Sequence, residues 1–194
     1  MSSVGIILGN GESRRSVEYT TFASLKGRLP VYGCNALYRD FQPTTLVAVD
    51  RQMIREIQIA KYTGKFVYRD KVDLVVTEGG KELTRLKSPG WAAGPTAALL
   101  LCLHERVDTC YMLGFDLYGK AGKVNNIYKG TENYVACDSP EIGYTNWVTQ
   151  LNEVFKMFYT VRFLRVGDVK DEVPILWKNR VQFISIDQFR RNLA

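Results

Sequence analysis

Three apolar runs near the start of the chain each end abruptly at a polar residue. The runs cover residues 4–8, 29–34 and 45–49, and the polar residues that close them are Asn10, Asn35 and Asp50. A short, continuous apolar run predicts a strand that is buried on both faces. Such strands occur in mostly parallel sheets with helices on both sides, so these runs favour an α/β fold.

The rest of the chain continues the alternation of strand and helix. Apolar runs predict further strands at 66–68, 74–77, 107–115, 161–166 and 181–186. Apolar residues at helical spacing predict helices over 36–41, 51–62, 95–105, 144–159 and 186–193, the last capped by Asp187. Residues 81–89 are polar and are predicted to form an exposed connection. We therefore expect a Rossmann-like three-layer fold with a mostly parallel sheet.

Length and composition are those of one ordinary globular domain. A chain of 194 residues, with 46% hydrophobic and 24% charged residues, is long enough for one well-buried core, so we expect a single domain over residues 1–194. It has no apolar run of about 18 residues and no export signal. Its four cysteines are isolated, and three lie in apolar surroundings, which is typical of reduced core residues. These features predict a cytoplasmic protein.

The net charge of +6 has two interpretations. It suits an anionic ligand such as a nucleotide, or a nucleic-acid surface, and it equally suits simple solubility. The chain has no arginine-rich run, zinc-finger spacing or aromatic RNA-binding motif, so nucleic acid is the weaker of the candidate partners.

The turn after the first apolar run is Gly9-Asn10-Gly11, followed by Ser13 and Arg14. Glycines on both sides of an asparagine allow the backbone to approach a phosphate or ribose closely. The structural alternative is a tight turn in which Asn10 adopts a positive φ. The motif differs from the dinucleotide-binding and Walker patterns.

Acidic residues follow two of the predicted strands, at Asp50 and Asp116. Either carboxylate can act as a base, hold a sugar hydroxyl or bind a metal, and either can also serve a turn or a helix start. No Asp-x-Asp pair stands at a strand end, so we expect no obligatory metal. His104 is the sole histidine, and its place near the end of the 95–105 helix indicates a structural role. Proton transfer would then rely on a carboxylate, a tyrosine or the substrate.

Two further segments are candidates for ligand binding. Gly94, Pro95 and Thr96 open the 95–105 helix, whose N-terminal amides can receive an anion. Residues 119–143 lack periodicity, and a loop of this length is typical of a lid or a binding loop. Its asparagines and tyrosines suit the binding of a sugar acceptor. The acceptor candidates are Asn126, Tyr128 and Asn133.

The order of these motifs resembles the bacterial sialyltransferases that act on lipooligosaccharide, and also uncharacterised bacteriophage proteins. In those enzymes a Gly-Asn-Gly-Pro-Ser turn, an Arg-Cys-Asn segment, a Ser/Thr-Gly helix start and a Gly-Ile-Asp-Phe-Tyr strand end surround a cytidine nucleotide donor. The matching segments lie within residues 4–118, at Gly9–Ser13, Gly33–Tyr38, Val47–Asp50, Gly94–Thr96 and Tyr111–Tyr118.

The resemblance implies a role for each matching residue. By this resemblance, the residues that contact the nucleotide are Gly9, Asn10, Gly11 and Asn35, and residues 94–96 contact its phosphate. Asp116 and Tyr118 contact the donor or the acceptor. A phage origin would place the protein in the host cytoplasm.

Three hypotheses follow. The first is a metal-independent glycosyltransferase with a nucleotide-sugar donor, in which Ser13, Arg14, Gly94 and Thr96 help to bind the nucleotide while Asp50, Asp116 and Tyr118 carry the chemistry. The second is a phosphoryl or pyrophosphoryl transferase with Mg²⁺ held by Asp50 and Asp116. The third is a non-catalytic module that binds a nucleotide or nucleic acid.

Overall fold

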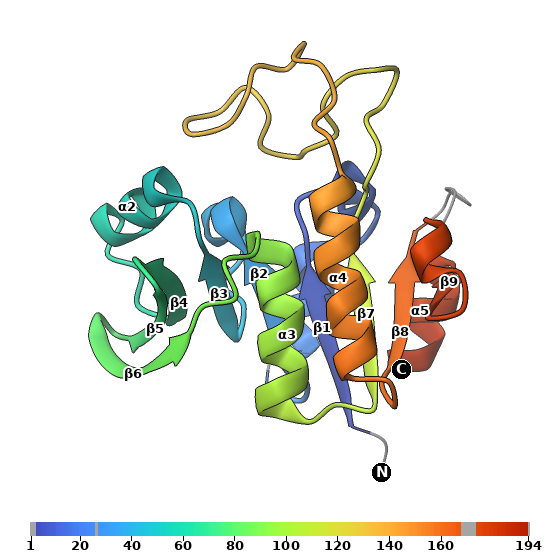
Figure 1. The fold of residues 1–194 in the computed structure, drawn as a ribbon, viewed down its shortest axis with the longest axis horizontal. Helices are drawn as coiled ribbons and strands as arrows, with labels where there is room; N and C mark the ends of the chain where they lie inside the picture. Colours follow the sequence, from blue (N-terminus) through green and yellow to red (C-terminus); the bar gives the residue numbers. More distant parts are fainter. Residues whose placement is uncertain (1–2, 26, 168–173, 194) are drawn as a thin grey trace.

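The computed structural model describes residues 3–25, 27–167 and 174–193. Within these residues nine strands form one sheet (Figure 1). The strands are β1 Val4–Leu8, β2 Val31–Cys34, β3 Thr45–Ala48, β4 Lys65–Asp70, β5 Asp73–Glu78, β6 Lys81–Lys87, β7 Thr109–Leu113, β8 Arg162–Val166 and β9 Val181–Ile184. The helices are α1 Tyr19–Leu25, α2 Arg51–Ile59, α3 Ala93–Glu105, α4 Thr145–Met157 and α5 Ile186–Leu193, with short 3₁₀ helices η1 Glu12–Ser16, η2 Asn35–Arg39 and η3 Ile175–Trp177.

The sheet has the order β6-β5-β4-β3-β2-β1-β7-β8-β9. Seven strands, β4-β3-β2-β1-β7-β8-β9, pair in parallel with their neighbours. The pairs β4–β5 and β5–β6 are antiparallel hairpins. The chain leaves β1 toward β2 and leaves β7 toward β8, so the connections diverge between β1 and β7. In open parallel sheets this divergence is the point where ligands bind, beyond the carboxyl ends of the strands.

Helices cover both faces of the sheet. On one face the core contains Ile7 of β1 and Met112 of β7 beneath α3, α4 and η3. On the other, Ile6 and Leu8 pack with α1, η2, α2 and α5. Because side chains alternate along a strand, the unbroken apolar run of β1 supplies both cores. The structure thus confirms the three-layer, Rossmann-like α/β fold with a mostly parallel sheet.

The segment 81–89 differs in part from its prediction. It is exposed, as predicted, yet Lys81–Lys87 forms the edge strand β6 rather than an irregular connection. The sequence did not predict this strand because an edge strand with little burial needs no apolar pattern, and the side chains of β6 are mostly polar. Gly79 and Gly80, at φ of 55° and 77°, form the two-residue turn of the β5–β6 hairpin.

The start of α5 also corrects a prediction. The amide of Gln188 donates to the hydroxyl of Ser185 at 3.1 Å, so Ser185 caps this helix. Asp187, which the sequence favoured as the cap, lies in the first turn instead. Both residue types suit a cap, and the helix begins at Ile186, two residues earlier than a cap at Asp187 requires.

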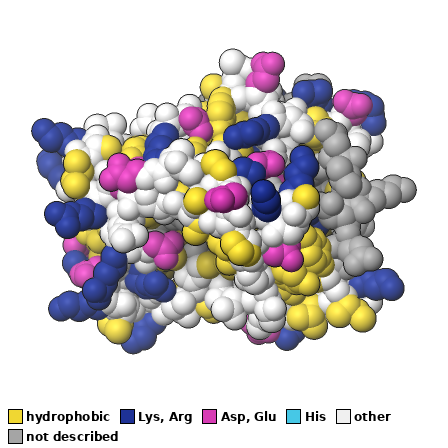
Figure 2. Space-filling model, turned by 90° about the horizontal axis from the view of Figure 1, so that it is seen from above, with side chains coloured by type: hydrophobic (Ala, Val, Ile, Leu, Met, Phe, Trp, Pro, Cys, Tyr) yellow, Lys and Arg dark blue, Asp and Glu magenta, His cyan; other side chains and the backbone are white. Residues whose placement is uncertain are grey.

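Other features of the described residues bear on the remaining expectations. Cys34, Cys102 and Cys110 are buried with free thiols, whereas Cys137 is exposed. No helix in the described part of the chain is long and apolar enough to cross a bilayer. Figure 2 looks down on the carboxyl ends of the strands, where acidic and basic side chains are interspersed and many Lys and Arg side chains lie toward the end of the molecule with α2 and β4–β6.

Candidate functional site

The turns after β1 and β7 lock together at the divergence point of the sheet. The amide of Gly9 donates to the carbonyl of Leu113 at 2.8 Å, and that of Gly11 donates to Gly114 at 2.8 Å. A Cβ at Gly9 would overlap the Gly114 carbonyl, and one at Gly11 would lie 2.5 Å from Cγ of Asp116. The two glycines are therefore required by the close approach of these turns.

Backbone conformation corrects the structural alternative for Asn10. Among the described residues, the asparagines with a positive φ are Asn35, at 53°, and Asn133, at 62°, whereas Asn10 is not among the positive-φ residues. Asn10 is held instead by its side chain, which accepts from Arg14 at 3.1 Å and donates to the Tyr134 hydroxyl at 3.1 Å. The amides of Glu12 and Ser13 are also paired, with Asn125 and Asp116. The glycine turn thus has few free amides to offer a phosphate.

A cavity of about 190 Å³ opens beside this turn, between the ends of β1–β3 and the start of α3. We call it the glycine-turn cavity. It brings together eight of the residues that sequence selected: Gly9, Asn10, Gly11, Asn35, Asp50, Gly94, Asp116 and Asn126. Segments far apart in the chain meet here because the carboxyl ends of parallel strands share one edge of the sheet.

Two features of the glycine-turn cavity suit an anionic, hydroxyl-bearing ligand. The amides of Ala93 and Gly94 open α3, and among the described residues they have no hydrogen-bond acceptor. With the helix dipole, they make this end attractive to a phosphate. The side-chain oxygen of Asn35 is buried without a partner in the described structure. A ribose hydroxyl or a base amino group would satisfy it.

The two acidic candidates differ in their freedom to react. Asp116 accepts hydrogen bonds from the Ser13 amide, at 2.7 Å, and from the Ser13 hydroxyl, so its carboxylate holds the start of η1. Asp50 stands at the N-cap position of α2 but makes no capping hydrogen bond, and it is exposed. Asp50 is therefore the more available carboxylate. In the described part of the chain, no group of three or more His, Cys, Asp or Glu is placed to hold a metal.

Cys34 also lines the glycine-turn cavity. Burial raises the pKa of its thiol to about 12, so the thiol stays protonated at neutral pH. Because the thiolate is the reactive form, Cys34 does not suit a nucleophilic role.

Six of the sequence candidates lie outside the glycine-turn cavity: Ser13 and Tyr118 line a larger neighbouring cavity, described below, whereas Arg14, Thr96, Tyr128 and Asn133 line neither of these two. Arg14 is only 1% exposed and donates to the Gly9 carbonyl, Asn10, Tyr19 and Tyr128. Thr96 is fully buried in α3. Tyr128 is buried, with its hydroxyl donating to Asp40 at 2.7 Å, and Asn133 donates to Glu56 at 2.6 Å. The sequence predicted ligand contacts for these four residues, whereas in the structure their side chains are buried or bonded to other parts of the chain.

The 119–143 loop is docked on the carboxyl edge of the sheet (Figure 1). Its Ile127 amide donates to the Asn10 carbonyl at 2.8 Å, and Lys129 pairs with Glu12 at 2.8 Å. At its far end Arg39 of η2 donates to Thr131 at 2.7 Å and to the Glu132 carbonyl at 3.0 Å. The loop is thus tied to η1 and η2, on both sides of the glycine turn.

Glu56 anchors the far end of the loop. It accepts from Tyr38 at 2.6 Å, from Arg39 at 2.7 Å and from Asn133 at 2.6 Å. Burial pushes its pKa up, but these hydrogen bonds outweigh burial and leave the pKa lowered. A lowered carboxyl pKa contributes stability above the unfolded value, about 4.3, and loses it as pH falls through the folded pKa.

We therefore expect Glu56→Gln to lower the free energy of unfolding by about 1–2 kcal/mol at pH 7 and to flatten its fall between about pH 5 and 3. Amide hydrogen exchange of residues 129–134 should quicken in the variant. Glu153→Gln is the control, since Glu153 forms an exposed pair with Lys156. If amide exchange rates of residues 129–134 and the pH dependence of the free energy of unfolding are the same in the two variants, Glu56 does not anchor the loop.

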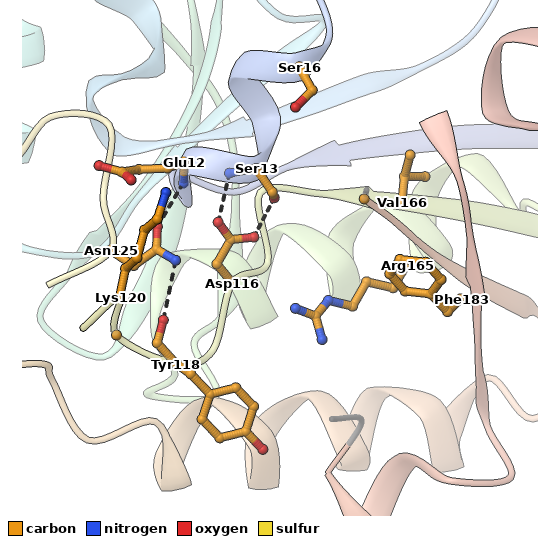
Figure 3. A pocket seen from close by; sticks show the side chains of 12 residues that line it. Glu12, Ser13, Ser16, Asp116, Tyr118, Lys120, Asn125, Arg165, Val166 and Phe183 are labelled. Atoms are coloured by element: carbon orange, nitrogen blue, oxygen red, sulfur yellow. Dashed lines mark hydrogen bonds between the residues drawn. The ribbon is translucent and has the colours of Figure 1, made fainter. Parts of the chain in front are cut away.

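A second cavity, of about 450 Å³, also borders Asp116 (Figure 3). We call it the Arg165 cavity. Ser13 and Tyr118, two of the sequence candidates, line it together with Arg165 and Lys120. Asp116 and Asn125 line both cavities. Ligands bound in the two cavities would thus be neighbours.

Arg165 was missed by sequence reasoning. It sits within the apolar run of β8, is 3% exposed, and directs its guanidinium into the cavity (Figure 3). A charged residue inside a buried strand, close to its carboxyl end, is a signal that could have singled it out. Lys120 escaped notice because loop lysines are common.

No protein-family model matches the chain, and neither the curated proteins nor the solved structures include a significantly similar one. The fold and the two cavities define the class: an α/β protein with a Rossmann-like three-layer sheet and adjoining cavities at the divergence point of its strands.

Proposed function

We propose that the protein is a nucleotide-sugar-dependent glycosyltransferase that works without a metal ion. One observation carries the proposal: the glycine-turn cavity gathers the free amides of α3, the unpaired oxygen of Asn35 and the exposed carboxylate of Asp50. The first two suit the phosphate and ribose of a nucleotide, and the third suits a base beside them. The resemblance of the motifs to sialyltransferases favours a cytidine nucleotide.

Two adjoining cavities also suit a transfer reaction. The glycine-turn cavity is smaller than the range of roughly 300–1,000 Å³ that is usual for small-molecule sites, whereas the Arg165 cavity falls within it. A donor in the first would place its transferred group near Asp116 and Asn125, where the second begins. A transferase needs this proximity of two substrates.

In this mechanism the α3 amides hold the donor phosphate and stabilise the negative charge of the departing nucleotide. As the acceptor hydroxyl attacks the sugar, its proton passes to Asp116, which borders both cavities, or to Asp50 of the glycine-turn cavity. Asp116 orders the η1 turn through Ser13. Asn126 of the loop lines the glycine-turn cavity, and its side-chain amide donates to sugar hydroxyls in this mechanism.

Titration of the full chain with CMP, UDP and GDP, followed by amide NMR and thermal unfolding, tests the nucleotide site. We expect saturable shifts at Ala93 and Gly94 with at least one nucleotide. Incubation with nucleotide sugars and detection of released nucleotide by mass spectrometry then tests turnover. Absence of both shifts and thermal stabilisation at millimolar nucleotide would refute the proposal.

If Asp50 is the base, Asp50→Asn should lower turnover of the donor by roughly 10²–10⁴-fold while nucleotide affinity changes little, because the variant keeps the shape but loses the base. Asp138→Asn, an exposed change in the loop away from both cavities, is the control. Unchanged turnover in Asp50→Asn would exclude Asp50 as the base.

The same variant discriminates the second candidate, a Mg²⁺-dependent phosphoryl or pyrophosphoryl transferase. Asp50 and Asp116 line one cavity, which is the observation in its favour. In that case nucleotide binding would require Mg²⁺, and Asp50→Asn would abolish it. Nucleotide binding without turnover of any donor, or salt-sensitive binding of DNA or RNA, would instead indicate a non-catalytic module.

A further inference from the structure

The Arg165 cavity has the chemistry of a site for a small anionic molecule. Its basic side chains are Arg165, which enters from β8, and Lys120 of the loop after β7, which lies beside Asn125 and Glu12 at the other end of the lining (Figure 3). Each of its two carboxylates is engaged by the chain itself. Glu12 pairs with Lys129, which lowers its pKa, and Asp116 accepts from Ser13.

Burial strengthens the attraction between the Arg165 guanidinium and an anion. Its side chain is shielded from bulk water at 3% exposure, and charges attract more strongly where water is scarce. A guanidinium has five N–H donors in a planar fork, so it can bind a carboxylate or phosphate in addition to other partners. The other described buried charged side chain, Arg14, is enclosed by tyrosines and backbone and borders neither cavity.

The size of the Arg165 cavity limits which class of ligand fits it. About 450 Å³ exceeds what a bare phosphate or carboxylate needs and fits a molecule of sugar size. The neighbouring hydroxyls of Ser16 and Tyr118 can serve the neutral part of such a molecule.

We propose that the Arg165 cavity binds the second substrate of the transfer, and that this substrate carries a phosphate or carboxylate held by Arg165 and Lys120. The assignment of a second substrate rests on the proposed transferase function. The binding of the anionic group rests on the cavity alone.

Amide NMR of the full chain at constant ionic strength tests the site, with glucose 1-phosphate as the anionic probe and glucose as its neutral counterpart. We expect glucose 1-phosphate to shift the amides of Ser13 and Gly119 saturably and glucose to leave them unchanged. Arg165→Met should weaken binding by roughly tenfold or more, since a charged hydrogen bond is lost. Arg162→Met removes the same charge from an exposed position of β8 and should change affinity less than about twofold.

A second pair of variants covers the case in which Arg165→Met does not fold. Lys120→Met should weaken binding by roughly threefold or more, whereas Lys123→Met, three residues along the same exposed segment, should not. Absence of saturable shifts, or equal weakening by target and control variants, would overturn the site.

Titration with CMP separates this inference from the proposed function. CMP shifts at Ala93 and Gly94 report the donor site, and they can occur whether or not glucose 1-phosphate binds. If glucose 1-phosphate causes amide shifts and CMP causes none, the anion site is supported and the proposed donor site is refuted. Displacement of glucose 1-phosphate by CMP from Ser13 and Gly119 would assign the anionic group to the donor and overturn the second-substrate assignment.

Discussion

Arg14→Ala should destabilise the protein by roughly 3–5 kcal/mol, which corresponds to a fall in Tm of roughly 6–20 °C for a domain of this size. Arg14 is 1% exposed, and its guanidinium joins the Gly9 carbonyl, Asn10, and the hydroxyls of Tyr19 and Tyr128 at 3.2 and 3.0 Å. Removing it leaves these acceptors buried with fewer donors and opens a void between η1 and the loop.

The charge of Arg14 is balanced through the tyrosines. Tyr19 and Tyr128 both donate onward to one oxygen of Asp40, at 3.0 and 2.7 Å. Arg14→Lys keeps the charge but replaces a fork of donors by a single ammonium, so we expect a loss intermediate between wild type and Arg14→Ala.

Arg15→Ala is the matched control. Arg15 is the next residue, is exposed, and makes one hydrogen bond to the Ile127 carbonyl at 3.2 Å, so its loss should cost less than about 0.5 kcal/mol. Thermal unfolding of the three variants measures the differences. Equal Tm values for Arg14→Ala and Arg15→Ala would contradict a structural role for Arg14.

Gly9→Ala should destabilise the protein by about 2–4 kcal/mol and also distort the glycine-turn cavity. The added Cβ would overlap the backbone carbonyl of Gly114 and approach Phe115 at 3.2 Å. A backbone atom cannot rotate away as a side chain can, so the turns after β1 and β7 must separate. That separation strains the hydrogen bonds from Gly9 to Leu113 and from Gly11 to Gly114.

Gly143→Ala is the control for this change. Gly143 is exposed, is not among the positive-φ glycines, and a Cβ there would have no neighbour within 4 Å. We expect the control to be neutral or slightly stabilising. Urea unfolding of both variants gives the two free energies, and a Gly9→Ala protein as stable as Gly143→Ala would show that the turns are not locked as described.

Together the two predictions define what the Gly-Asn-Gly turn does. Its glycines allow two backbone turns to touch, and Arg14 fixes the turn against the loop. A ligand phosphate is better served by the free amides of α3 than by this turn. The turn therefore shapes one wall of the glycine-turn cavity.

Much of the fold could be predicted from the sequence because burial on both faces leaves an unbroken apolar run, as in β1 and β7. Edge strand β6 escaped because its side chains face water. The sequence favoured Asp187 over Ser185 as the cap of α5 because both residue types, two positions apart, suit a cap, and only the position where the helix begins discriminates between them.

The cavities show the same division. The residues that follow strands, such as Asn10, Asn35 and Asp116, could be selected from sequence because strand ends of a parallel sheet must share an edge. By itself the sequence determined the α/β class and this convergence, since both follow from local apolar patterns. Tertiary structure alone decided that Arg14 and Tyr128 face each other in the interior while Arg165 borders a cavity. The contacts of these side chains come from segments far apart in the chain, and no local pattern carries that information.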